Sequence, residues 1–195
     1  ETGLIILSDF PLLDGRQKSF EHKASGWLAI KNGETVASKG ILTAILDHPV
    51  LGKVLVGTLH VVSNYDGKIT FEDVREEQFK EALAFLSQRE AESPGIPEIL
   101  TGDFNLAPQG QSYSPLWERL LQMLSGFERF VPAVPVSTRS STNPYSDEDE
   151  GQLDHIFFNS RFKAVDGEVR FNTPDTIFSD HYGWENQLVL VPSPS

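Results

Sequence analysis

The stretch "ILTGDFNLAP", residues 99–108, joins an apolar run typical of a buried strand to a glycine and two polar residues. Asp103 and Asn105 enclose the large apolar Phe104 directly after the run. Asp and Asn favour turns because their side chains form local hydrogen bonds, so a turn alone would explain this pattern. The rest of the sequence decides whether these two residues also carry chemistry.

Size and composition set the first limits. The 195 residues are 39% hydrophobic, which fits one domain, residues 1–195, with a buried core. A net charge of -12 disfavours a broad basic face for nucleic acid, although a local basic groove stays open. Because cysteine is absent, any metal must bind to oxygen or imidazole ligands.

The sequence says little about location. No apolar stretch approaches the roughly 20 residues that cross a bilayer. The first residues, "ETGLIILSDFP", lack the basic region of a secretion signal and place a strand close to residue 4. We therefore expect an upstream segment to precede the chain, and we leave its compartment and oligomeric state open.

Apolar runs and turn signals predict eight strands. They cover residues 4–7, 26–30, 40–46, 54–59, 98–100, 153–158, 165–171 and 187–191. A helix is predicted over 70–92, where Thr70 and Asp73 have the spacing of a capping box. A second helix is predicted over 114–126, with Ser114 as its cap.

Residues 131–152 form a long segment rich in proline, serine and threonine, which indicates a loop. Long loops in compact domains either carry function or are mobile, and both interpretations stay open here. The acidic cluster at 147–150 is expected to be solvated charge.

Polar side chains suited to phosphate chemistry recur at the ends of four predicted strands. These residues are His60, Asp103, Asn105, Asp154, Asp180 and His181. Carboxylates bind hard divalent cations and orient water, while an imidazole and an amide stabilise phosphoryl oxygens. A serine hydrolase is not indicated, because the G-x-S-x-G pattern of a nucleophile elbow is missing. The set predicts metal-assisted hydrolysis of a phosphate ester at one converging site.

The motifs "LTGDFN", "LDHIFFN" and "SDHYG", in this order and with "GTLH" upstream, resemble the endonuclease/exonuclease/phosphatase superfamily. Arg75 and Gln78 resemble the R-x-x-Q of its helix after the histidine strand, and the resemblance runs from residue 3 to about 191. It implies an α/β fold like that of deoxyribonuclease I, a four-layer α/β/β/α sandwich of two mixed sheets. The active site of such a fold lies where strand ends meet.

The resemblance also implies roles for individual residues. The implied metal ligands are Asp103, Asn105 and Asp180, with magnesium as the expected ion and manganese as the alternative. Asp103 would orient or deprotonate the attacking water, and Asn105 would bond a phosphoryl oxygen. His181 would stabilise or protonate the reacting phosphate, and Asp154 would orient His181 from a neighbouring strand. His60 would contact the phosphate.

Other ionisable residues receive structural interpretations. Strand alternation points His155 away from the face that carries Asp154. His22 and His48 lie in turn-like contexts and are also expected to be structural. Lys39 is either a solvated charge at a strand edge or a phosphate contact, and the sequence leaves both open.

One part of the family pattern has no counterpart in this sequence. The family carries a metal-binding Glu in a motif like Q-E-V, and an earlier Asn, on strands upstream of "GLIILS". Glu1 lies too close to the expected strand to take the place of that Glu. We therefore expect the chain to match the C-terminal two-thirds or so of a catalytic domain, without its first strands. Truncation explains this more simply than natural loss of the metal site.

Two longer segments resemble neutral sphingomyelinases and related phospholipid phosphodiesterases: residues 26–46, which contain "SKG", and residues 141–158. This resemblance implies a phosphodiester substrate, with a phospholipid head group favoured over nucleic acid, and peripheral contact with a membrane. The alternatives are a nuclease or inositol phosphate phosphatase of the same superfamily, or a non-catalytic binding module that has lost its metal-binding Glu.

Overall fold

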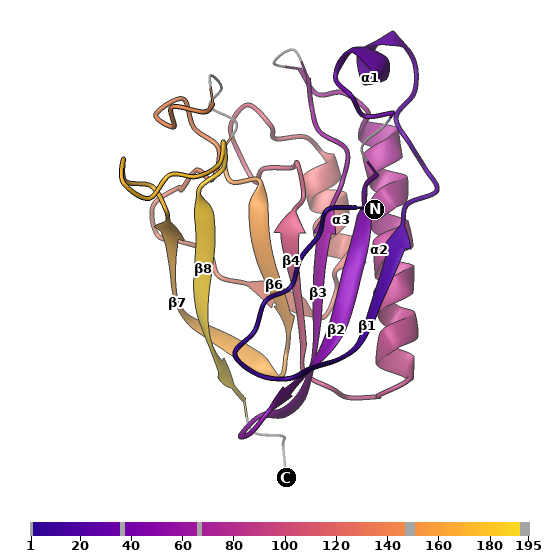
Figure 1. Cartoon of the computed structure of the whole chain (residues 1–195), viewed down its shortest axis with the longest axis vertical. Helices are drawn as coiled ribbons and strands as arrows, with labels where there is room; N and C mark the ends of the chain where they lie inside the picture. The colour runs from indigo at the N-terminus through magenta and orange to yellow at the C-terminus, as the bar shows by residue number, and fades with distance from the viewer. Residues whose placement is uncertain (1, 36–37, 66–67, 147–150, 192–195) are drawn as a thin grey trace.

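The computed structural model describes residues 2–35, 38–65, 68–146 and 151–191, so the acidic cluster at 147–150 lies outside the described residues. Two sheets and three helices form within these ranges (Figure 1). In chain order the elements are β1 (Leu12–Ser19), α1 (Trp27–Lys31), β2 (Gly40–His48), β3 (Gly52–His60), α2 (Glu72–Ala91), β4 (Glu98–Asp103), α3 (Leu116–Met123), β5 (Phe127–Arg129), β6 (Asp154–Asn159), β7 (Phe162–Arg170) and β8 (Gly183–Leu190).

The larger sheet has six strands in the order β1-β2-β3-β4-β6-β5. Strands β3 and β4 are parallel, and the other neighbouring pairs are antiparallel, so the sheet is mixed. A parallel pair needs a crossover connection, which the long helix α2 provides. This crossover brings the end of β3 beside the end of β4.

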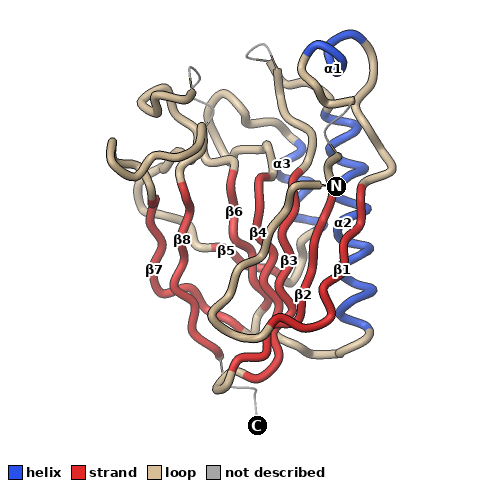
Figure 2. The backbone as a smooth tube through the Cα atoms, viewed as in Figure 1, coloured by secondary structure: helices blue, strands red, loops and turns tan. Residues whose placement is uncertain are grey.

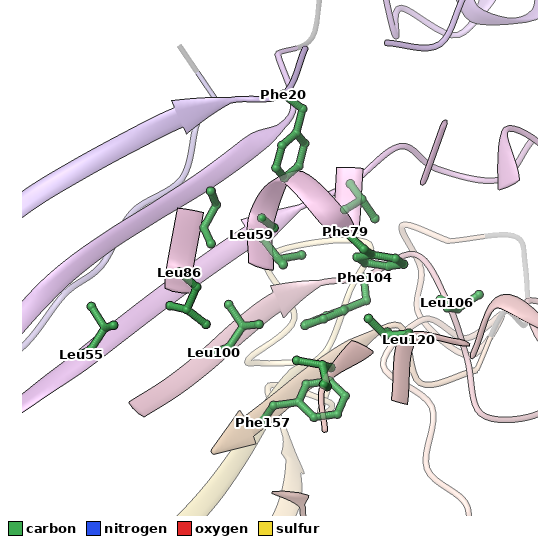
Figure 3. Close-up of a cluster of buried hydrophobic side chains, with 14 of the residues drawn as sticks. Phe20, Leu55, Leu59, Phe79, Leu86, Leu100, Phe104, Leu106, Leu120 and Phe157 are labelled. Carbon is green, nitrogen blue, oxygen red and sulfur yellow. The ribbon is translucent and has the colours of Figure 1, made fainter. Parts of the chain in front are cut away.

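The main core lies between this sheet and helices α2 and α3 (Figure 3). Its labelled members include Phe79 and Leu86 from α2, Leu100 from β4, Leu120 from α3 and Phe157 from β6. Removing these apolar side chains from water is the main driving force that holds the helices on the sheet.

The opposite face of the large sheet packs against the β7–β8 hairpin (Figure 2). Successive strand residues point to opposite faces, so Phe158 joins this second cluster while its neighbour Phe157 joins the main core. Phe162 of β7 and Leu188 of β8 complete the contact from the hairpin. The predicted α/β fold with two packed sheets is confirmed.

The layers differ in detail from the expected sandwich. The small sheet is an antiparallel hairpin rather than a mixed sheet. Helices cover the large sheet, but none of the helices in the described ranges forms a fourth layer over the hairpin (Figure 1). No helix in the same ranges is long and apolar enough to cross a membrane.

Two strand predictions are wrong. Residues 4–7 have no regular secondary structure and pair with no described strand, and Ile5 and Leu7 point largely into solvent. Most of the predicted strand at 26–30 is the short helix α1 instead, and Asn32 closes its end by donating from Nδ2 to the carbonyl of Leu28 at 2.9 Å.

Of the two predicted helix caps, one does not form and the other does. The capping box at α2 does not form: the helix begins after Phe71 in the left-handed region, and Thr70 accepts the N–H of Tyr65 instead. At α3, the hydroxyl of Ser114 accepts the N–H of Leu116 at 3.2 Å, as a capping side chain does.

The Arg75–Gln78 pair on α2 holds the chain that follows β3. Arg75 donates from Nε to the carbonyl of Val62 at 3.0 Å and from Nη2 to Asn64 at 2.8 Å. The side-chain oxygen of Gln78 accepts the N–H of Val62 at 2.8 Å. Both side chains are buried, so these bonds fix the position at which the end of β3 leaves the sheet.

Candidate active site

The strand register places three of the predicted residues in one row. His60 at the end of β3 lies opposite Asp103 at the end of β4, and Asp103 lies opposite Asp154 at the start of β6. Residues paired across neighbouring strands point to the same face of a sheet. Accordingly, Nε2 of His60 lies 3.4 Å from Oδ2 of Asp103.

The C-terminal end of β4 requires its glycine. Gly102 has a φ of +135°, and a Cβ on it would lie 2.0 Å from the carbonyl oxygen of Leu59. Asn105 adopts a left-handed φ of 45°, which asparagine tolerates, and its N–H donates to Oδ1 of Asp103 at 2.8 Å. Its Nδ2 donates to the carbonyl of Val61 at 3.0 Å. The turn interpretation and the site interpretation of this stretch are therefore compatible.

His181 reaches the row from a loop between β7 and β8. Its Nδ1 lies 2.8 Å from Oδ2 of Asp154, the pairing expected from the sequence. The loop is anchored next to this contact, since the N–H of Tyr182 donates to the carbonyl of Thr138 and Asn143 donates to the carbonyl of Ser179 at 2.9 Å.

Carboxylates surround His181 and control its charge. Burial alone would lower its pKa, but the hydrogen bond to Asp154 and the nearby charges of Asp103, Asp154 and Asp180 raise the pKa to about 9. Burial raises the pKa of Asp154, and the charge of Asp103 adds to this effect. The shared proton resides on the imidazole, so His181 is a cation at neutral pH.

His60, in contrast to the protonated His181, is held in its neutral form. Nζ of Lys39 lies 2.8 Å from Nε2 of His60, and because an ammonium group can only donate, Nε2 must be the acceptor. Burial lowers the pKa of His60, and the charge of Lys39 lowers it further against the opposing charge of Asp103. His60 is therefore a neutral imidazole with its proton on Nδ1.

Lys39 is a buried partner of His60 behind the cavity lining rather than a solvated charge. Its side chain is only 10% exposed and also lies 3.4 Å from Oε1 of Glu34, which accepts a hydrogen bond from Tyr65. The interpretation of Lys39 as a solvated charge at a strand edge is wrong, because the sequence could not show that Glu34 and His60 would enclose it.

These side chains line a cavity of about 370 Å³. Its lining residues are His60, Ser63, Asp103, Asn105, Arg139, Asp154, Ser179, Asp180 and His181. All six candidate residues from the sequence are present. Ser63, Arg139 and Ser179 were not predicted, and Arg139 lies 3.9 Å from Asp180. One feature of the sequence could have indicated Arg139 as a site residue: it is the one basic residue between 131 and 152.

The cavity has a donor set that fits a divalent metal ion. Ligand atoms of Asp103, Asp154 and His181 all lie within 4.8 Å of one another. A protonated imidazole cannot bind a cation, so the two carboxylates are the donors, and hard cations prefer such oxygen ligands. Asn105 and Asp180, which the resemblance implied as metal ligands, line the same cavity, and Asp180 lies outside this close group.

The remaining histidines are structural. His155 is buried on the opposite face of β6, as alternation predicted, with Nε2 2.9 Å from the carbonyl of Leu106 and its ring packed on Trp117. Burial lowers its pKa to about 4. His22 contacts Glu81 at 2.8 Å, and Nδ1 of His48 accepts backbone N–H groups of the following turn.

Two packed sheets with carboxylates and histidines gathered at strand ends define a protein of the deoxyribonuclease I-like fold class. The chain belongs to the Endonuclease/Exonuclease/phosphatase family, whose sequence model matches residues 1–181. Members of this family are metal-dependent hydrolases that act on phosphoester bonds. No curated protein matches the chain.

Several solved structures share the fold. An endonuclease/exonuclease/phosphatase from Beutenbergia cavernae is 20% identical with a TM-score of 0.66, and the match covers 93% of this chain and 46% of that one. The beta toxin of Staphylococcus aureus is 18% identical with a TM-score of 0.66, over 92% of this chain and 65% of that one. A mannosyl-6-phosphatase from Bacteroides thetaiotaomicron is 17% identical with a TM-score of 0.56, and the match covers 93% of this chain and 67% of that one. This chain therefore spans about half to two-thirds of the length of these proteins.

Proposed function

We propose that residues 1–195 form one domain of a metal-dependent phosphodiester hydrolase of the sphingomyelinase type, which acts on a phospholipid head group. Membership of the family supports phosphoester hydrolysis. The choice of sphingomyelin rests on the resemblance of residues 26–46 and 141–158 to neutral sphingomyelinases. The observation that carries the proposal is the row of His60, Asp103 and Asp154, completed by a protonated His181.

His181 acts as the cationic group of the reaction. Its Nδ1 is held by Asp154, which leaves Nε2–H to donate toward a phosphate in the cavity. A preformed donor stabilises the negative charge that develops on phosphoryl oxygens in the transition state. With a pKa of about 9, His181 still carries this proton at neutral pH and can transfer it to the leaving oxygen.

Asp103 orients the attacking water and accepts its proton. Its Oδ1 accepts the N–H of Asn105, whereas Oδ2 faces the unprotonated Nε2 of His60 and is available to water. Asn105 keeps one amide hydrogen for a phosphoryl oxygen, since only one is needed for its bond to Val61. The Nδ1–H of neutral His60 serves as a further donor to the phosphate.

Asp103 and Asp154 would hold the divalent ion, with Asn105 and Asp180 as further oxygen donors in the same cavity. Magnesium is the expected ion and manganese the alternative. When bound, such an ion neutralises charge on phosphoryl oxygens. It would also neutralise Asp103 and Asp154, which face each other across neighbouring strands.

Two other functions use the same cavity. The likeness to a mannosyl-6-phosphatase favours a phosphatase, and the family description includes nucleases. The net charge of -12 favours a lipid head group or a small phosphodiester over duplex nucleic acid. A non-catalytic binding module is the third alternative, because the sequence has no counterpart of the metal-binding Glu.

The test compares three substrates with the complete protein and magnesium. Phosphocholine release from sphingomyelin vesicles is measured beside plasmid nicking and hydrolysis of inositol phosphates, each with wild type and His181→Ala. We expect phosphocholine release that depends on His181, and co-sedimentation of the protein with the vesicles. Plasmid nicking, or phosphate release from inositol phosphates, without cleavage of sphingomyelin would contradict the proposal that the substrate is a phospholipid. Hydrolysis of none of the three substrates would favour a binding module.

A further inference from the structure

A second cavity, of about 470 Å³, shares no lining residue with the candidate active site. It lies between the turn after β4 and the proline-rich segment that follows β5, and its apolar wall includes Pro108, Val131, Pro132, Pro135 and Val136. Cavities of this size with mainly apolar walls and a few polar groups are typical of small-molecule sites in proteins.

Arg129 at the end of β5 supplies a charge to this cavity. Its guanidinium group stacks over the ring of Trp117, with 5.0 Å between Cζ and the ring centroid. Its Nη1 atom is buried and has no hydrogen-bond partner in the described ranges of the chain. No carboxylate in these ranges forms an ion pair with Arg129, although acidic residues outnumber basic ones by 28 to 16 in the whole sequence.

Within the described part of the chain, Arg129 lacks the counter-charge that burial normally demands. Arginine stays protonated in proteins, and a partly buried charge without a counter-charge is unfavourable. The stacking on Trp117 compensates only part of this loss, because an aromatic ring supplies neither a counter-ion nor a hydrogen-bond acceptor for Nη1. An anion that enters the cavity would supply the missing counter-charge, and the planar guanidinium binds carboxylate and phosphate oxygens well.

Two segments that line this cavity continue into the lining of the active site. Ser137 and Gln152 line the second cavity, whereas Arg139 and Asp154, two residues further along each segment, line the active site. Thr138 ties the two segments together by accepting the N–H of Asp154 at 3.2 Å. A ligand in the second cavity would therefore contact the same two segments that carry Arg139 and Asp154 into the active site.

We propose that this second cavity binds a small amphiphile with a carboxylate or phosphate head and an apolar body. The head pairs with Arg129, and the body packs against the valines and prolines of the wall. The shared feature of the two head groups is a pair of anionic oxygens that fits the guanidinium fork. This site goes beyond the proposed hydrolysis, and binding to it does not depend on any catalytic activity.

The test titrates the complete protein with octanoate and octyl phosphate, which separate the two head groups, and follows backbone amide signals by NMR. Octanol lacks the charge, and acetate lacks the apolar body. We expect saturable binding of at least one of the two anions, with shifts at Gly110 and Val136, and at least about tenfold weaker binding of both controls.

Arg129→Gln should weaken binding of the anion by at least about tenfold, whereas Arg170→Gln, which removes an exposed charge on β7, should leave it unchanged. Contacts between the methylene groups of the anion and the methyl groups of Val131 and Val136 in wild type, seen as intermolecular NOEs, test the site even where the variant unfolds. Equal binding by Arg129→Gln, equal binding of octanol, shifts confined to other regions, or no saturation would each overturn the proposal.

Discussion

Asp103 and Asp154 lie directly opposite each other in the antiparallel pairing of β4 with β6, at the end of the sheet where the two strands meet the loops. Two neighbouring carboxylates repel each other unless positive charge compensates them. One compensating charge is His181, bonded to Asp154 at 2.8 Å. A divalent ion beside Asp103 would provide the other.

The first prediction concerns catalysis in the complete protein. Asp103→Asn and His181→Ala should each lower turnover about 100- to 10,000-fold, because one removes the group that orients water and the other removes the charged donor. Initial rates with the substrate that the protein hydrolyses best measure this. Asp47→Asn and His22→Ala, which change groups outside the cavity, serve as controls and should keep the wild-type rate. Equal loss in all four variants would mean that the cavity is not the active site.

The second prediction concerns the turn that holds Asp103. Gly102→Ala should lower the free energy of unfolding by at least about 3 kcal/mol, because its Cβ would meet the carbonyl oxygen of Leu59 at a positive φ. Urea denaturation measures the change. Gly15→Ala is the matched control, since Gly15 lies in β1 with nothing within 4 Å of the added Cβ. If both variants had wild-type stability, the close approach of β3 and β4 would be wrong.

The third prediction follows from the buried His155. The pKa of His155, about 4, lies below the ordinary value of 6.5. Between these two pH values the imidazole is therefore protonated in the unfolded chain and neutral in the folded chain. This contribution to stability is present above pH 6.5, falls as the pH drops toward 4, and amounts to about 3 kcal/mol in total. The free energy of unfolding should therefore fall less over this range in His155→Gln than in wild type. Parallel curves for the two proteins would contradict a buried neutral histidine.

Much of the site could be predicted from the sequence because its residues sit in short motifs at strand ends. The apolar run before Asp103 and the one after Asp154 predicted two strands, and the structure adds that these strands pair, which brings the two carboxylates together. Lys39 could not be interpreted, because its partner His60 comes from a later strand and no local pattern shows that Glu34 folds back onto it. Arg139 was missed because it lies in a loop, and a loop has no periodic pattern that predicts the direction of a side chain.

The errors in the fold have a common physical cause. β1 contains Asp14 and Gly15 and shows no regular alternation, so only its pairing with β2 makes it a strand. Strand β5 has three residues and depends in the same way on β6. Conversely, "LIIL" at 4–7 looks like a strand but pairs with none in the described ranges. Tertiary pairing overrides local preference at such edges.

The fourth prediction tests the neutral state of His60. Lys39→Met should raise the pKa of His60, because the variant removes a nearby positive charge while Asp103 remains. NMR titration of the ring protons measures the change, and Lys18→Met is a control at a lysine with no contact to His60. An unchanged pKa of His60 in Lys39→Met would mean that the ammonium group does not donate to Nε2.

Whether Asp154 keeps His181 charged is measured by an NMR titration of the His181 ring in wild type and in Asp154→Asn. We expect a pKa of about 9 for His181 in wild type and a fall of at least about one unit in the variant, because the neutral amide no longer stabilises the imidazolium. A wild-type pKa at or below 6.5, or the same pKa in both proteins, would contradict the claim that Asp154 keeps His181 charged in the cavity.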